Sequence, residues 1–84
     1  MENFFKGLID KKTLRILNLL FEHGDDLWHI KKISIESEVP LSTTFRIIKK
    51  FLRLNIVEKS LVGKLKIYKL AKNKKTDYLK RVLK

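Results

Sequence analysis

The sequence predicts a mainly α-helical α+β fold with one small β-hairpin near its C-terminal end. Apolar residues recur at helical spacing in four segments, at residues 11–23, 27–38, 42–55 and 73–84. Two β-prone runs, IVEKSL and LKIYKL, flank VGK, whose glycine suits the turn of a hairpin. A chain of 84 residues can bury one modest core, so we expect a single domain over residues 1–84.

The first helix is expected to begin after Asp10, a residue type that caps helix N-termini, and to stop at Gly24. Its predicted core face consists of Leu14, Leu17, Leu20 and Phe21. Ile16 and Leu19 fall outside this face, which predicts a second surface that covers them.

The second helix is expected to follow Asp25 and Asp26 and to open with Trp28. The residues predicted to face inward are Ile30, Ile33, Ser34 and Ser37. A turn is expected at Val39 and Pro40, since a residue before proline disfavours the helical conformation. Trp28, the only tryptophan, is expected to anchor the core or an interface.

The third helix separates apolar from basic side chains. Ser42 or Thr43 is expected to cap it, and Asn55 suits the left-handed conformation found just past helix ends. Around Ile48, the predicted core face consists of Leu41, Thr44, Phe45, Phe51, Leu52 and Asn55. The opposite face carries Thr43, Arg46, Lys50 and Arg53, with Ser42 and Lys49 on one flank.

The hairpin is followed by a closing amphipathic segment. Gly63 is expected to form the turn between the two strands. The apolar side of the closing helix is predicted to carry Tyr78, Leu79, Val82 and Leu83.

The net charge of +11 is concentrated in the second half of the chain. Residues 1–42 hold six basic residues against seven acids, whereas residues 43–84 hold fourteen against two, a net charge of +12. A half this basic indicates an anionic partner, of which nucleic acid and anionic membranes are the common ones. The alternative is a lysine-rich solubilising surface, consistent with sixteen lysines and a single alanine.

The basic face of the third helix fits double-stranded DNA. A helix of about 10 Å diameter enters the major groove, where its outward side chains meet base edges and its flanks meet phosphates. Arginine can fork two hydrogen bonds to guanine, small hydroxyl groups approach base edges closely, and lysines suit the backbone. The expected DNA-binding residues of this helix are Ser42, Thr43, Arg46, Lys49, Lys50 and Arg53.

The stretch ISIESEVPLSTTFRIIKKFLRLNIVEKS, followed by GKLKIYKL, resembles the winged helix-turn-helix domains of bacterial and archaeal transcription regulators of the ArsR-like and MarR-like kind. With the first helix, the resemblance covers about residues 10–72. It implies that Ser34 and Val39 pack the two central helices and that Ser42, Thr43 and Arg46 enter the groove. It also implies that Tyr68 and Leu70 return the second strand to the core.

The sequence departs from that family at two positions where its members often have glycine. Glu38, in the turn between the second and third helices, implies a different turn. Asn55, at the end of the third helix, is a milder change because asparagine tolerates positive φ.

The hairpin, at residues 57–70, is expected to act as the wing on the DNA backbone beside the groove. Lys59, Lys64 and Lys66 are expected on or near its tip, within reach of phosphates or the minor groove. The alternative is that these lysines protect exposed strands from pairing with other chains.

Other kinds of site are not expected. His23 and His29, with Asp25 and Asp26 between them, lack a closed ligand set, and helix capping explains the same acids, so no metal site is predicted. No phosphate loop and no nucleophile with a base partner stands out, so we expect neither an enzyme nor a cofactor. The absence of cysteine, signal peptide and membrane span favours a cytoplasmic, nucleoid-associated protein with no membrane partner.

The terminal segments 1–9 and 73–84 carry more apolar residues than a small core needs. We expect them to form a homodimer, which presents two recognition helices to a palindromic site. The alternative is that both ends fold back on their own domain. The expected function is therefore sequence-specific double-stranded DNA binding by a transcriptional regulator; the alternatives are a winged helix used for protein–protein contact and a non-specific DNA-packaging protein.

Overall fold

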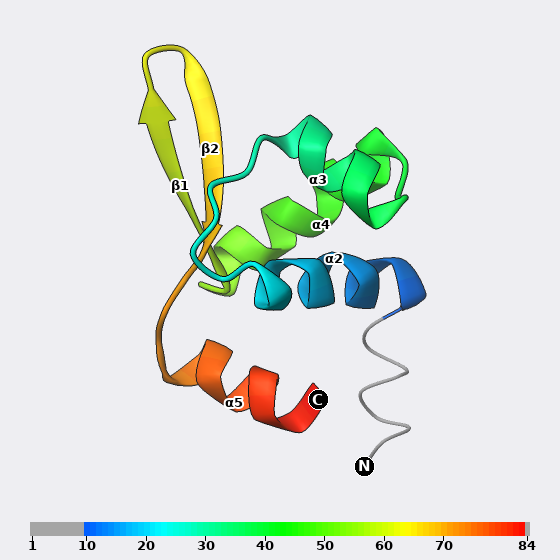
Figure 1. Cartoon of the computed structure of the whole chain (residues 1–84), viewed down its shortest axis with the longest axis vertical. Coiled ribbons are helices and arrows are strands. Elements are labelled where there is room, and N and C mark those ends of the chain that lie inside the picture. The colour runs from blue at the N-terminus through cyan, green and yellow to red at the C-terminus, as the bar shows by residue number, and fades with distance from the viewer. Residues whose placement is uncertain (1–9, 84) are drawn as a thin grey trace.

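A computed structural model describes residues 10–83, which form four helices and a two-stranded antiparallel hairpin (Figure 1). In chain order the elements are α2 (Lys11–Glu22), α3 (Ile30–Ser37), α4 (Leu41–Arg53), β1 (Val57–Val62), β2 (Leu65–Leu70) and α5 (Lys74–Leu83). This order confirms the predicted α+β, winged helix-turn-helix fold. In Figure 1 the hairpin projects from the helical body, and α2 lies between α5 and the pair formed by α3 and α4.

Helix α2 begins at the predicted cap, and its buried face overlaps the predicted one but is rotated toward Ile16. The carboxylate of Asp10 accepts a hydrogen bond from the backbone N–H of Thr13 over 2.8 Å. The buried apolar residues of the helix are Ile16, Leu17 and Leu20. The prediction that Ile16 lies outside the core face is therefore wrong, because the helix turns this residue fully inward and leaves Leu14 half-buried. Leu19 packs against the same core from its edge.

Helix α3 begins later than predicted because the residues before it extend the sheet. It starts at Ile30, and His29 rather than Asp25 or Asp26 occupies the N-cap position. Trp28 forms an antiparallel bridge with Tyr68, in which the N–H of each residue donates to the carbonyl oxygen of the other over 2.7 Å. The Trp28 side chain is buried, which confirms it as a core anchor, although it stands beside β2 instead of opening the helix.

The turn between α3 and α4 is closed by hydrogen bonds around Val39. Glu38 adopts the left-handed conformation, with φ 57°, and its N–H donates to the Ile35 carbonyl oxygen over 3.3 Å. The N–H of Val39 donates to the Ser34 carbonyl oxygen over 3.1 Å, which completes a Schellman motif. The carbonyl oxygen of Val39 accepts from the hydroxyl groups of Ser34 and Thr44, one from each helix. The expectation of a different turn at Glu38 is wrong, since glutamate takes the conformation that glycine favours.

Helix α4 starts one residue earlier than the predicted range of 42–55 and ends two residues earlier, at Arg53. Pro40 occupies the N-cap position, so neither Ser42 nor Thr43 caps the helix. At the other end Asn55 has a φ of 59°, which confirms the predicted left-handed residue. The N–H of Ile56 then donates back to the last turn of α4 over 2.8 Å, so that the chain turns directly into β1.

The hairpin pairs along the full length of both strands. Val62 faces Leu65 across a two-residue loop whose first residue is Gly63. Gly63 has a φ of 64°, which confirms the predicted turn glycine. Tyr68 and Leu70 are buried, so β2 does return to the core as the family resemblance implied.

Helix α5 is capped by a reciprocal pair of hydrogen bonds between Asn73 and Thr76. The Thr76 N–H donates to the Asn73 side-chain oxygen over 2.9 Å, and the Asn73 N–H donates to the Thr76 hydroxyl over 3.1 Å. Thr76 is buried and Leu79 packs against the core, whereas Tyr78 and Val82 are 54% and 40% exposed. One side of α5 therefore folds back on its own domain, and part of its predicted apolar side remains open.

A single hydrophobic core joins these elements and fixes the direction of α4. Its buried members are Ile16, Leu17, Leu20, Trp28, Ile33, Val39, Ile47, Ile48, Phe51, Ile56, Val57, Tyr68 and Leu70. These residues come from α2, α3 and α4, from the segment before α3, and from both strands. The core therefore holds the hairpin and α4 in one rigid frame.

Candidate nucleic-acid interface

Helix α4 buries one face and exposes the other, but it is rotated from the predicted orientation. Its buried residues are Thr44, Ile47, Ile48 and Phe51. Two residues predicted for the core, Leu41 and Phe45, are instead 41% and 44% exposed, and Asn55 is exposed as well. The centre of the buried face has thus moved toward Ile47, by about half of the 100° step between neighbouring residues.

This rotation changes which of the predicted DNA-binding residues lie at the centre of the exposed face. Directly opposite the buried face lie Ser42, Arg46, Lys49 and Arg53, all of them exposed. Thr43 is half-buried, and its hydroxyl accepts a hydrogen bond from the guanidinium group of Arg46 over 3.5 Å. Lys50 is exposed on the flank toward α2. The structure brings all six residues to one side of α4, which we call the basic surface.

A cleft between the start of α2 and α4 sets a carboxylate beside this basic surface. Asp10 lines the cleft together with Arg46, Lys49, Lys50 and Arg53. Hydrogen bonds from the backbone and side chain of Thr13 hold the pKa of Asp10 below its ordinary value, and the charge of Lys50 lowers this pKa further. The carboxylate is therefore ionised at neutral pH and offsets part of the positive charge on this flank.

The three predicted wing lysines are all exposed, but they lie at different heights on the hairpin. Lys64 is the second residue of the two-residue loop, at the tip. Lys66 pairs across the hairpin with Leu61, next to the tip. Lys59 pairs with Tyr68 and therefore lies in the middle of β1, so the expectation of a position near the tip is wrong for this residue.

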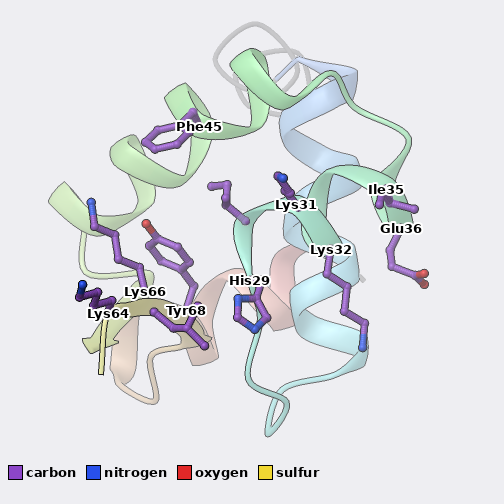
Figure 2. A pocket seen from close by; sticks show the side chains of 11 residues that line it. His29, Lys31, Lys32, Ile35, Glu36, Phe45, Lys64, Lys66 and Tyr68 are labelled. Atoms are coloured by element: carbon purple, nitrogen blue, oxygen red, sulfur yellow. The ribbon is translucent and has the colours of Figure 1, made fainter. Parts of the chain in front are cut away.

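A groove of about 640 Å³ lies beside α3, between Phe45 of α4 and the hairpin, and we call it the α4–wing groove. Its apolar floor consists of Ile30, Ile35, Phe45, Leu65 and Tyr68. Its basic residues are His29, Lys31, Lys32, Lys64 and Lys66, with Glu36 as the acid among the lining residues. Figure 2 shows Phe45 on α4 across the groove from Lys66 and Tyr68 on β2.

The contributions of α3 and of Phe45 to the α4–wing groove were not predicted from the sequence. Lys31 and Lys32 are exposed on α3, and the ammonium group of Lys32 lies 5.4 Å from the centre of the Trp28 ring. These lysines were visible as an isolated basic pair before the turn. The exposure of Phe45 could have been predicted from the spacing of Ile47, Ile48 and Phe51. These three residues define a core face that excludes position 45.

The two histidines have different surroundings, and only His29 lines the α4–wing groove. His23 contacts Asp26, with 3.4 Å between Nδ1 and the carboxylate oxygen, and its ring meets the edge of Trp28 at a centroid distance of 5.7 Å. His29 occupies the N-cap position of α3. Within residues 10–83 no group of three or more His, Asp or Glu side chains lies close enough to bind a metal ion.

The helix-turn-helix geometry agrees with a known family of domains. The family model of the IclR helix-turn-helix domain matches residues 11–60, from the start of α2 into β1. The chain belongs to the IclR helix-turn-helix domain family. Because such domains place a recognition helix in the DNA major groove, this IclR-type domain is a DNA-binding transcription regulator. The predicted membership among winged helix-turn-helix regulators is thereby confirmed.

Solved structures share the fold. The crystal structure of AF1382 from Archaeoglobus fulgidus is 30% identical, with a TM-score of 0.70 over 93% of this chain and 90% of that one. The homodimeric winged helix-turn-helix DNA-binding domain of a possible ArsR-family regulator from Mycobacterium bovis is 20% identical, with a TM-score of 0.72 over 93% and 69%. A MarR family transcriptional regulator from Silicibacter pomeroyi is 14% identical, with a TM-score of 0.74 over 98% and 54%. Comparison with curated proteins gives no match.

Among residues 10–83, each helix is too short or too polar to cross a lipid bilayer.

Proposed function

We propose that this IclR-type domain binds a specific sequence of double-stranded DNA, with α4 in the major groove and the hairpin on the flanking backbone. The residues proposed to contact DNA are Ser42, Thr43, Arg46, Lys49, Lys50, Arg53, Lys59, Lys64 and Lys66. Ser42 and Arg46 are assigned to base edges, since they lie in the first half of α4 and recognition helices read bases from that end. The lysines are assigned to phosphates.

The observation that carries this proposal is the division of α4 into two faces. Thr44, Ile47, Ile48 and Phe51 fix the helix to the core, and this contact makes Arg46 and Lys49 point outward. A helix held rigidly by one face can keep the other in a constant position, which base reading requires because hydrogen bonds to base edges depend on direction.

The hairpin supports the same interface from the side. Lys64 and Lys66 line the α4–wing groove from β2 and its loop, opposite α4. If α4 occupies the major groove, these ammonium groups lie beside the groove's edge, where phosphates are found. Lys59, lower on β1, is the least favoured of the three for this contact.

We further propose that residues 1–84 form one domain, with a core at about residues 10–72, that acts as a homodimer in the cytoplasm on chromosomal DNA. The exposed side of α5, which includes Tyr78 and Val82, offers an apolar contact for a second copy. The Mycobacterium bovis domain, which shares the fold, is homodimeric. Segment 1–9, the other predicted dimerisation element, lies outside the described residues.

Regulation would follow from occupancy. A dimer that covers a promoter excludes or recruits the transcription machinery by steric contact, and it requires no catalytic group. The proposed dimer also predicts the form of the target: two half-sites about one DNA turn apart, related by two-fold symmetry.

The experiment that tests the proposal is selection of bound duplexes from a randomised DNA pool at physiological salt, followed by sequencing. An enriched palindrome with half-sites about ten base pairs apart supports a dimeric, sequence-specific regulator. If every sequence is retained alike, the proposal of a sequence-specific regulator is wrong and a DNA-packaging function replaces it. No retention would favour the protein–protein contact that other winged helices use.

A further inference from the structure

Phe45 is an apolar side chain at the edge of the basic surface. Its exposed fraction is 44%, and it lines the α4–wing groove rather than the core. Single exposed apolar residues are common on proteins, so the exposure alone indicates little. The position is informative, because Phe45 lies one residue before Arg46 and close to one helical turn from both Ser42 and Lys49.

These spacings place the ring between two proposed sets of DNA contacts. Ser42 and Arg46 lie on one side of it, along the line of α4 that faces away from the core. Lys64 and Lys66 lie on the other side, across the α4–wing groove (Figure 2). With α4 in the major groove, the ring of Phe45 therefore meets the part of the groove where base edges give way to the backbone.

The chemistry of the major groove restricts what an exposed phenyl ring can meet there. Base pairs present hydrogen-bond donors, acceptors and one apolar group, the C5 methyl group of thymine. A donor or acceptor covered by the ring loses its water without gaining a partner, which is unfavourable. The methyl group loses nothing on contact and leaves water together with the ring.

We propose that Phe45 is a base-reading residue that selects thymine. Its ring contacts the C5 methyl group of one thymine per half-site, on the wing side of the base contacts made by Arg46. This inference rests on the proposed function and adds to it a preference for an A·T pair at one position.

The rest of the groove fits the strand that carries such a thymine. The floor beside Phe45 includes Tyr68 and Leu65, which suit the apolar face of a deoxyribose. Lys31 and Lys32 of α3 line the same groove, so basic residues contribute to it from both α3 and the hairpin. A DNA strand, with apolar sugar and methyl groups between phosphates, matches this combination of floor and charge.

The test removes a single methyl group from the DNA. In the duplex obtained by selection, each thymine is replaced in turn by deoxyuridine, which pairs identically and lacks only the C5 methyl group. For the unaltered protein, one replacement per half-site is expected to weaken binding about fourfold, the effect of one buried methyl group. Replacements elsewhere should leave the affinity unchanged.

The protein variants assign the effect to Phe45. Phe45→Ala should bind the thymine duplex more weakly than the unaltered protein does. It should bind the thymine and deoxyuridine duplexes with the same affinity, so that the fourfold difference between them disappears. Phe45→Leu, which keeps an apolar contact, should retain part of it. Leu54→Ala is the matched control, because Leu54 is also 44% exposed at the end of α4 but does not line the groove. Thermal unfolding of each variant confirms that it is folded.

The possible failures are distinct. If a specific duplex is selected and no thymine methyl group affects binding, the Phe45 proposal is overturned while the proposed function stands. The same conclusion follows if Phe45→Ala remains sensitive to deoxyuridine, since another residue then reads the methyl group. If the pool yields no preferred sequence, the proposed function fails and this inference fails with it.

Discussion

The side-chain amide of Asn73 donates a hydrogen bond to the backbone carbonyl oxygen of Asn55 over 2.9 Å. Asn55 is the left-handed residue that ends α4, and Asn73 caps α5, so this bond joins the ends of the two helices. The ammonium group of Lys75 adds a second link, to the carbonyl oxygen of Leu54 over 2.8 Å. Helix α5 therefore helps to hold the C-terminal end of α4 in place.

Replacing Asn73 with alanine removes both the cap of α5 and its link to α4. We expect the free energy of unfolding to fall by about 1–2 kcal/mol, measured by urea denaturation. Asn73→Ser keeps a capping oxygen but is too short to reach Asn55, so its loss should be smaller. Equal losses in the two variants would show that the link, and not the cap, carries the stability.

Glu38 stores strain in the turn before α4. A left-handed conformation costs an L-residue about 1–2 kcal/mol, and glycine avoids this cost while losing more chain entropy on folding. We therefore expect Glu38→Gly to raise the free energy of unfolding by about 0.5–1 kcal/mol. Glu36→Gly, inside α3, should lower it by a similar amount. A loss of stability in Glu38→Gly would mean that the glutamate side chain makes a contact worth more than the strain.

Asp10 links stability to pH. Its pKa is lowered in the folded protein by hydrogen bonds from Thr13, so the ionised carboxylate contributes stability above the ordinary value of 3.8. That contribution is lost as pH falls through the lowered folded pKa. Asp10→Ala should lower the free energy of unfolding by about 1 kcal/mol at neutral pH. This difference from the unaltered protein should become smaller in strong acid.

Asp10→Asn is the control for this titration, because asparagine also caps helices but carries no carboxylate. The free energy of unfolding of Asp10→Asn should exceed that of Asp10→Ala by the same amount at neutral and acid pH. Urea denaturation at both pH values supplies the three comparisons. A constant difference between the unaltered protein and Asp10→Ala would rule out a titrating cap.

Local chemistry made some features of the fold predictable. Asp10 at a helix start, Asn55 past a helix end and Gly63 in a hairpin turn each satisfy a requirement that depends on near neighbours. Trp28 shows the opposite case. Its partner Tyr68 is distant in sequence, and no local pattern indicates that Trp28, in the segment before α3, pairs with β2.

The rotation of helices about their axes was the main source of error. Ile16 was expected outside the core and Phe45 inside it, and the structure reverses both. Helical periodicity predicts that apolar residues form a stripe along a helix. Where this stripe is wide, packing against other elements decides which part of it is buried. The cationic residues of α4 were easier to assign, because lysine and arginine are rarely buried without a partner.

The exposed side of α5 predicts an effect of charge on assembly. At micromolar concentration, analytical ultracentrifugation should show a particle of twice the chain mass. Val82→Glu places a carboxylate on the proposed apolar contact and should shift the protein toward monomer, by about tenfold or more in dissociation constant. Leu27→Glu, at a more exposed site outside the terminal segments, should leave the dimer intact. A monomeric unaltered protein at this concentration would overturn the proposed dimer.

Base reading and backbone binding are separable by two variants. Arg46→Ala should relax the preference for one base pair, at a cost of about 1–3 kcal/mol for the preferred duplex, because a forked contact to guanine is lost. Lys64→Ala should weaken all sequences alike and reduce the slope of log affinity against log salt by about one. Lys80→Ala, on α5, removes the same charge outside the proposed interface and should change neither quantity. Unchanged affinity and preference in Arg46→Ala would show that α4 does not read DNA through its basic surface.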